Sequence, residues 1–211
     1  MKYYQINNKY LDCGCDDGYC FVRCRDILAF LREADQDLIE IMPTSAVECF
    51  WLDDVNVRVY KTRTARRKNA GKILDNLECL IKRGADVHAG GEHALRWAVE
   101  AGLCDVVRRL IDLGADFNVN DNDLIVTAAI RNDWRMVKTL IYSGGAFVRA
   151  DNDVVLQWAI VRREIDVCRF LIDNGASITA ALDDQLPRSA VAWAKKHVMP
   201  YARKKLVNKN S

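Results

Sequence analysis

The chain has 211 residues, of which 50% are hydrophobic and 28% are charged. This length supports one good core, or a small domain beside a longer one, and excludes several large domains. No apolar run approaches the roughly 18 residues that a membrane-spanning helix needs, and residues 1–10 lack the apolar segment of a signal peptide. We therefore expect a cytoplasmic protein whose eight cysteines are free thiols, because a reducing compartment disfavours disulfides.

The formal net charge of +2 conceals an uneven distribution. Residues 55–72 carry seven basic side chains, residues 195–211 carry six, and neither stretch contains an acid. The rest of the chain therefore has a formal charge of −11. The sequence thus predicts an acidic body with two basic patches.

Residues 1–66 predict a small α/β module that we call the leader. Val55, Val57 and Val59 alternate with polar residues as strands do, and the apolar residues at 27, 28, 30 and 31 cluster as in a short helix. The expected elements are strands at 1–6, 18–22, 37–42 and 48–60, with a helix at 26–34.

Four cysteines of the leader fall within twelve residues: Cys13, Cys15, Cys20 and Cys24. Thiolates are good zinc ligands, so a zinc-stabilised leader is one interpretation. The spacing is not the paired C-x-x-C that makes such a signal specific. We favour the other interpretation, in which these thiols are small buried hydrophobes and the chain has no cofactor. The cysteines outside this cluster are expected on the core faces of strands and helices: Cys49, Cys79, Cys104 and Cys168.

The densest basic run of the chain follows the last predicted strand of the leader. Its members are Lys61, Arg63, Arg66, Arg67 and Lys68. With Trp51 and Tyr60 nearby, this run could hold nucleic acid through phosphate contacts and base stacking. Our alternative function is therefore a nucleic-acid-associated protein that uses the basic patches at 58–72 and 195–209. The interpretation that we favour is a solvated connector between the leader and the residues that follow.

The second part of the chain is an internal repeat. Gly84, Gly114, Gly145 and Gly175 are separated by 30, 31 and 30 residues, and an alanine follows each one. A Leu-Ile pair precedes each glycine, and the extra residue of the middle interval is the doubled glycine at 144–145. Glycine at this place predicts a helix end in the left-handed conformation.

Each repeat unit contains two apolar stripes at helical spacing. In the first full unit, Ala94, Leu95, Ala98 and Val99 form the inner stripe, and a second stripe begins at Val106. One such helix pair cannot bury its own apolar face, so neighbouring pairs must stack. The units are a partial one at 70–84, full ones at 85–114, 115–145 and 146–175, and a C-terminal cap at 176–207.

The Gly-Ala-Asp turn at 84–86, the Ala-Leu-x-x-Ala helix at 94–98 and the Asp-Val-Val-x-x-Leu-Ile helix at 105–111 resemble the ankyrin repeat. The 30-residue unit is similar to that of mimivirus-like ankyrin proteins from giant amoeba-infecting viruses. The resemblance implies a mainly α fold: an ankyrin-repeat solenoid of helix pairs at 67–211, behind the small α/β leader at 1–66. Because the usual unit has about 33 residues, we expect shortened fingers, which are the β-hairpin loops between successive helix pairs.

This resemblance further implies a protein–protein interaction scaffold, here a viral protein that binds a host factor through the finger tips and the concave face of the inner helices. The implied inner-helix residues are Arg96, Glu100, Arg131, Gln157 and Arg162. The implied finger residues are His88, Glu92, Asn118, Asn120, Asn122, Arg149, Asp151 and Asn152. Shortened fingers move the expected contact toward the inner-helix arginines.

Catalytic motifs are missing from the sequence. The three histidines lie in no H-E-x-x-H helix, and neither a nucleophile elbow nor a Gly-rich phosphate loop occurs. We therefore expect no enzyme and no membrane contact. Trp97 and Trp158 occupy equivalent repeat positions, where an aromatic is either core, which we favour, or an interaction hot spot.

Overall fold

The computed structural model describes residues 2–5, 19–33, 35–52, 56–63, 65–145, 148–182 and 186–209. It divides into two compact units, Met1–Asp116 and Phe117–Ser211. Each unit has its own set of buried apolar side chains. Among the described residues, no helix is long and apolar enough to cross a bilayer.

Unit 1 begins with a six-stranded antiparallel sheet in the order β4-β5-β2-β1-β3-β6. The strands are β1 (Tyr3–Gln5), β2 (Tyr19–Arg23), β3 (Asp37–Pro43), β4 (Glu48–Leu52), β5 (Val57–Thr62) and β6 (Ala65–Lys72). The first five confirm predicted strands, except that the segment predicted at 48–60 is two strands, β4 and β5. The expected fold class is confirmed only in part, because this sheet adds far more strand than "mainly α" implies.

Strand β6 corrects the interpretation of residues 61–68 as a connector. Its residues pair with β3 over almost the whole strand, from Ala65 opposite Pro43 to Lys72 opposite Asp37. Residues 65–72 show no alternation of apolar and polar residues, because β6 is an edge strand with mostly exposed side chains. β6 also crosses the boundary that the sequence suggested between residues 66 and 67.

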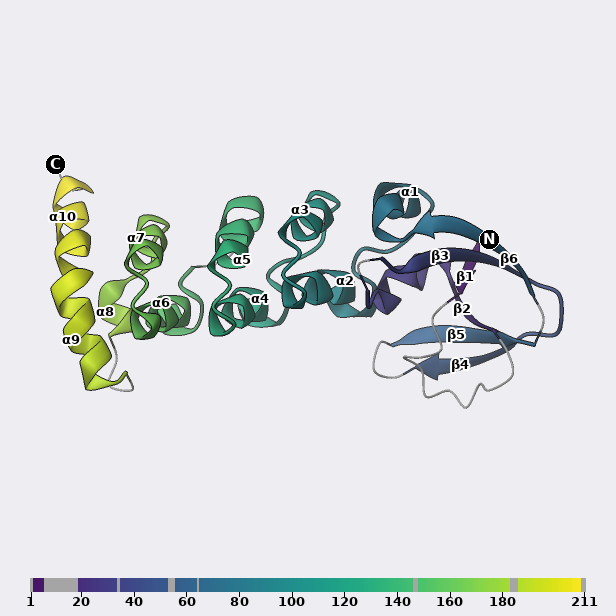
Figure 1. The fold of residues 1–211 in the computed structure, drawn as a ribbon, viewed down its shortest axis with the longest axis horizontal. Helices are drawn as coiled ribbons and strands as arrows, with labels where there is room; N and C mark the ends of the chain where they lie inside the picture. Colours follow the sequence, from purple (N-terminus) through teal and green to yellow (C-terminus); the bar gives the residue numbers. More distant parts are fainter. Residues whose placement is uncertain are drawn as a thin grey trace. The chain divides into compact units, whose positions relative to one another are not determined.

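The sheet curves strongly. Residues 63–64 alone connect β5 to β6, although three strands lie between them in the sheet. In a flat sheet β5 and β6 would be about 19 Å apart, whereas three Cα–Cα steps reach only about 11 Å. The ends of β5 and β6 therefore approach each other, as Figure 1 shows where the two strands meet at one end of the sheet.

The leader's only helical element among the described residues is a 3-10 helix, η2 (Cys24–Phe30). It replaces the α-helix predicted at 26–34. Residues 27–31 are all buried, so the segment is covered on more than one side and has no polar stripe of the kind that an amphipathic α-helix shows. A short, tightly wound 3-10 turn fits such a segment. η2 packs against the first inner helix of the repeats, α2 (Ala89–Glu100).

The remaining helices of unit 1 are η3 (Leu74–Asn76), α1 (Leu77–Lys82) and α3 (Cys104–Asp112). They confirm an isolated outer helix in the partial unit, followed by one full helix pair. Gly90, Gly91 and Glu92 have positive φ between 60° and 66°, so the right-handed part of α2 begins after them. This left-handed turn stands where an ankyrin finger would be.

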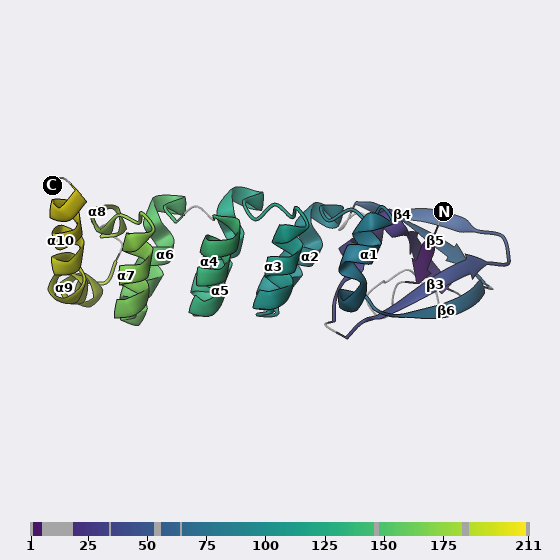
Figure 2. The same cartoon turned by 90° about the horizontal axis from the view of Figure 1, so that it is seen from above.

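Unit 2 consists of stacked helices (Figures 1 and 2). Its elements are α4 (Val119–Ile130), α5 (Trp134–Thr139), η4 (Leu140–Gly144), α6 (Ala150–Arg162), α7 (Ile165–Asp173), α8 (Ile178–Ala181), α9 (Arg188–His197) and α10 (Met199–Lys209). Inner helix α4 packs on α6, and α6 packs on α8 and α9. The small residues Ala128 and Ala159 are buried, which lets these helices approach closely.

The doubled glycine is accommodated by a change of helix type. The end of the second outer helix is a π-helical turn, η4, which closes on Gly145 in the left-handed conformation, with φ of 68°. A π-turn takes one residue more than an α-turn, so it absorbs the 31st residue without shifting the apolar register. The other three closing glycines also have positive φ, between 92° and 106°, as the repeat predicted.

A buried carboxylate joins successive elements of unit 2. Asp153 is 1% exposed. Its Oδ1 accepts the backbone N–H of Ser177 at 2.9 Å, and Arg149 Nε lies 3.7 Å from Oδ2. Asp153 has φ of 60°, a conformation that Asn and Asp tolerate better than other side chains. It therefore fastens the start of α8 to α6.

We predict that Asp153→Ala lowers the free energy of unfolding by about 2–4 kcal/mol, because it leaves the Ser177 N–H unpaired and places alanine in a left-handed conformation. Asp153→Asn keeps an oxygen acceptor and should cost about 1 kcal/mol or less. Urea denaturation provides the measurement. Asp166→Ala is the control on an exposed site; equal losses for Asp153→Ala and Asp166→Ala would contradict the fastening role.

Candidate protein-binding face

Two equivalent helix ends in unit 2 expose apolar side chains. Ile130 ends α4 and Val161 lies near the end of α6, 31 residues later, the same interval that separates Gly114 from Gly145. They are 48% and 39% exposed. A single exposed apolar side chain is ordinary. Two at the same position of neighbouring helices form a small apolar strip, which the sequence reasoning did not single out.

An arginine follows each of these apolar residues. Arg131 and Arg162 are both exposed, and no carboxylate within the described parts of the chain forms an ion pair with either one. The Arg162 guanidinium lies 5.9 Å from the centre of the Trp158 ring. We call Ile130, Arg131, Trp158, Val161 and Arg162 the arginine–apolar face.

The corresponding residues of unit 1 are engaged within the unit. Trp97, the equivalent of Trp158, donates its indole N–H to the Arg32 carbonyl at 2.9 Å. Arg96 donates to the Gly90 carbonyl at 3.1 Å, so its guanidinium is turned toward its own loop. Glu100 is exposed. Of the arginines implied for the inner helices and fingers, Arg96 and Arg149 are bonded within the chain, whereas Arg131 and Arg162 are exposed without a carboxylate partner in the described structure.

The predicted finger residues have diverse surroundings. His88 and Arg149 are exposed and each pairs with the acid four residues later, Glu92 or Asp153. Glu92 is only 4% exposed, which corrects its assignment as a contact residue. Asn118 is exposed and Gln157, on the inner helix, is half-buried. The side chains of Asn120, Asn122, Asp151 and Asn152 lie outside the described part of the structure.

The basic run is divided between two strands. Lys61 lies on β5, Arg66, Arg67 and Lys68 lie on β6, and Arg63 is exposed in the short link between them. Three strands separate β5 from β6 in the sheet. The run is therefore not one continuous strip along a single strand.

The structure describes two of the four cysteines in the cluster. Cys13 and Cys15 lie outside the described residues, whereas Cys20 and Cys24 are buried. Cys24 Sγ lies 3.9 Å from the Leu80 carbonyl, toward which its thiol points, and burial raises the pKa of this thiol. Within the described ranges, no three His, Cys, Asp or Glu side chains are grouped as metal ligands. Zinc at these cysteines stays an untested alternative.

Two other cysteines test the expectation that thiols outside the cluster pack in the core. Cys168 on α7 is buried, and desolvation raises its pKa to about 12, so it behaves as a small hydrophobe. Cys49 on β4 is exposed, which contradicts its expected core position. β4 is an edge strand, and its residues at 48, 49 and 51 are all exposed.

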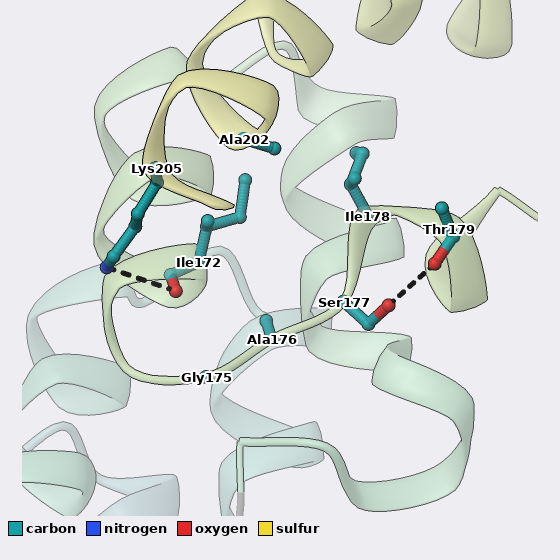
Figure 3. A pocket seen from close by; sticks show the side chains of 8 residues that line it. All are labelled: Ile172, Gly175, Ala176, Ser177, Ile178, Thr179, Ala202 and Lys205. Carbon is teal, nitrogen blue, oxygen red and sulfur yellow. Dashed lines mark hydrogen bonds between the residues drawn. The ribbon is translucent and has the colours of Figure 1, made fainter. Parts of the chain in front are cut away.

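A cavity of about 230 Å³ lies beneath the C-terminal cap (Figure 3). Its polar groups are already paired. Lys205 Nζ donates to the Ile172 carbonyl at 3.4 Å and contacts the Asp173 carboxylate, and the hydroxyls of Ser177 and Thr179 are 2.9 Å apart. The cavity is therefore a packing gap between α7, α8 and α10, and its one charged side chain, Lys205, is already paired with Asp173.

Residues 90–122 match the family model of the ankyrin repeat. The match supports an ankyrin repeat protein. It covers one repeat length, from the left-handed turn of α2 through α3 into α4. Ankyrin repeats are generally modules for protein–protein interaction and are not enzymes. No curated protein matches the chain.

The His88–Glu92 pair gives a pH-dependent prediction. The hydrogen bond to Glu92 raises the pKa of His88 above its ordinary value, against a smaller opposing effect of desolvation. The pair therefore contributes stability that is fully present below the unfolded pKa of about 6.5. That stability is lost as pH rises through the higher pKa of the folded state.

We expect Glu92→Gln to lower the pKa of His88 in an NMR titration, because the carboxylate that favours the imidazolium is gone. Glu100→Gln removes an exposed acid from the same helix and should leave this pKa unchanged. A His88 pKa that is the same in wild type and Glu92→Gln would show that the pair does not form in solution.

Proposed function

We propose that the chain is an interaction module that binds a protein through the arginine–apolar face of unit 2. One observation carries the proposal: at the ends of two neighbouring inner helices, exposed apolar side chains stand next to arginines that have no carboxylate partner among the described residues. Arginine and tryptophan are the residues most enriched at interaction hot spots.

The chemistry of the face indicates the chemistry of the partner. Two unpaired guanidinium groups favour carboxylates, which they can bind through two parallel hydrogen bonds each. The strip of Ile130 and Val161, with the half-buried Trp158 ring beside it, favours an apolar side chain between those carboxylates. We therefore propose an acidic segment with an apolar anchor as the partner's contact.

The resemblance to giant-virus ankyrin proteins supports a further step. We propose that the partner is a host-cell protein and that the encounter takes place in the cytoplasm. Nucleic-acid association has less support, because side chains alternate along β6 and place Arg67 on the face opposite Arg66 and Lys68.

The test is a selection of binding peptides from a random library on the full-length chain. We expect enriched peptides that combine Asp or Glu with an apolar residue, and we expect Arg131→Glu/Arg162→Glu to weaken their binding by about 100-fold. Each close charge pair across an interface contributes at least about 1.5 kcal/mol, and 1.4 kcal/mol is tenfold in affinity.

The matched control is Arg169→Glu/Arg203→Glu, which makes the same charge change on α7 and α10 at exposed positions of the same unit. This double variant should keep the affinity within about twofold. Peptides that bind the Arg131→Glu/Arg162→Glu variant as tightly as wild type would place the binding surface elsewhere.

A further inference from the structure

One face of the leader's sheet brings together charges that are far apart in the sequence. Tyr4 on β1 pairs with Glu40 on β3, and Glu40 pairs with Lys68 on β6. Directly paired residues of neighbouring strands lie on the same face of a sheet. Leu38 and Ala70, two residues away from Glu40 and Lys68, share this face because side chains alternate along a strand.

Helix α1 lies over the sheet (Figure 1). Side chains of α1 and of this face line a cavity between them. The cavity has a volume of about 180 Å³. This is several times the roughly 30 Å³ share of one water molecule, so it has room for a tetrahedral oxyanion. Lys2, Lys68 and Arg83 bring three cations to its wall, and Glu40 is its one carboxylate.

The charges of this cavity do not balance. Lys2 Nζ lies 2.8 Å from Glu40 Oε1, and this contact, aided by Lys68 and Arg83, lowers the pKa of the Glu40 carboxyl. Glu40 is therefore ionised and is satisfied by Lys2. Among the described residues no carboxylate lies within ion-pair distance of Lys68 or Arg83, so two positive charges remain.

A buried hydroxyl adjoins the same cations. Tyr4 is completely buried, and its hydroxyl lies beside the Arg83 guanidinium and the Cys24 thiol. Neither contact has the geometry of a full hydrogen bond among the described residues. Burial raises the pKa of this hydroxyl, and the neighbouring Arg83 guanidinium opposes the rise. A buried polar group without a partner is costly. A ligand oxygen or water held by Arg83 would give this hydroxyl an acceptor.

We propose that the cavity between α1 and the sheet binds a phosphate monoester in its dianionic form, with Lys68 and Arg83 as the principal contacts. Two residual positive charges match the charge of such a dianion. This site belongs to the leader and does not depend on the arginine–apolar face. A phosphodiester, as in a nucleic-acid backbone, carries one charge only and matches the cavity less well.

The test is isothermal titration of the full-length chain with glycerol phosphate and inorganic phosphate at constant ionic strength. We expect saturable binding with one site per chain. Lys68→Gln and Arg83→Gln should each weaken it by about tenfold or more, since a hydrogen bond to a charged group is lost. Lys68 is exposed on an edge strand, so this variant is expected to fold normally even if Arg83→Gln does not.

Two further variants sharpen the test. Arg67→Gln removes the same charge from the same strand but on the opposite face, where Arg67 pairs with Ile41, and should leave the affinity unchanged. Glu40→Gln removes the competing carboxylate and should tighten binding. The affinity for the monoester should fall as pH drops below about 6, where the phosphate loses its second charge.

The proposal is overturned if Arg67→Gln weakens binding as much as Lys68→Gln, which would indicate diffuse attraction to the basic strand. It is also overturned if dimethyl phosphate binds as tightly as glycerol phosphate, or if neither glycerol phosphate nor inorganic phosphate gives a saturable heat. An affinity gain in Glu40→Gln together with a loss in Lys68→Gln would support it.

Discussion

An inner helix of this chain is stable only when another element covers its apolar side, and the rest of the structure depends on that constraint. In unit 2 the neighbours of α6 are α4 on one side and α8 and α9 on the other. For α2, the first inner helix, the repeat supplies no preceding inner helix. The 3-10 helix η2 of the leader takes that place. A Cβ at Gly90 would come within 3.1 Å of the Ala29 side chain, and Trp97 is bonded to the Arg32 carbonyl.

This arrangement gives the leader a definite role. The sheet of the leader supports η2, which packs against α2, and it also carries α1. The leader therefore caps the first repeat with elements that are not themselves a repeat. As a consequence, the side of α2 that bears Trp97 contacts the leader and is not free to bind a partner. In unit 2 the ends of α4 and α6 keep unpaired arginines beside apolar side chains, and a rigid helix end is a good support for recognition.

The helix pairs were predictable because two strong signals coincide in them: apolar stripes at helical spacing and a glycine at each outer-helix end. The C-terminal cap was expected after the last closing glycine, and helices α8, α9 and α10 lie there. Strand β6 was not, because an exposed edge strand such as Ala65–Lys72 needs no apolar alternation. The role of η2 was also hidden, since contacts between residues 29 and 90 leave no local pattern.

The candidate sites also contain some residues that a sequence pattern could indicate and others that only the fold brings together. Arg131 and Arg162 could be selected from their repeat positions, and their apolar neighbours Ile130 and Val161 could have been found by the same alignment. Glu92 was expected among the finger contacts, and only its surroundings reveal that it is buried; the buried Asp153 was not singled out at all. The cavity of Lys2, Lys68 and Arg83 combines three distant segments, which no spacing along the chain could indicate.

The most direct test of the capping role is native-state hydrogen exchange of the α2 amides in wild type and Leu28→Ala. Leu28 is fully buried in η2, and its truncation should cost about 2–5 kcal/mol. If η2 caps the first repeat, α2 amides lose protection together with those of the sheet, and α6 amides keep theirs. If α2 keeps its wild-type protection while the sheet loses it, the leader is not the element on which the first repeat depends.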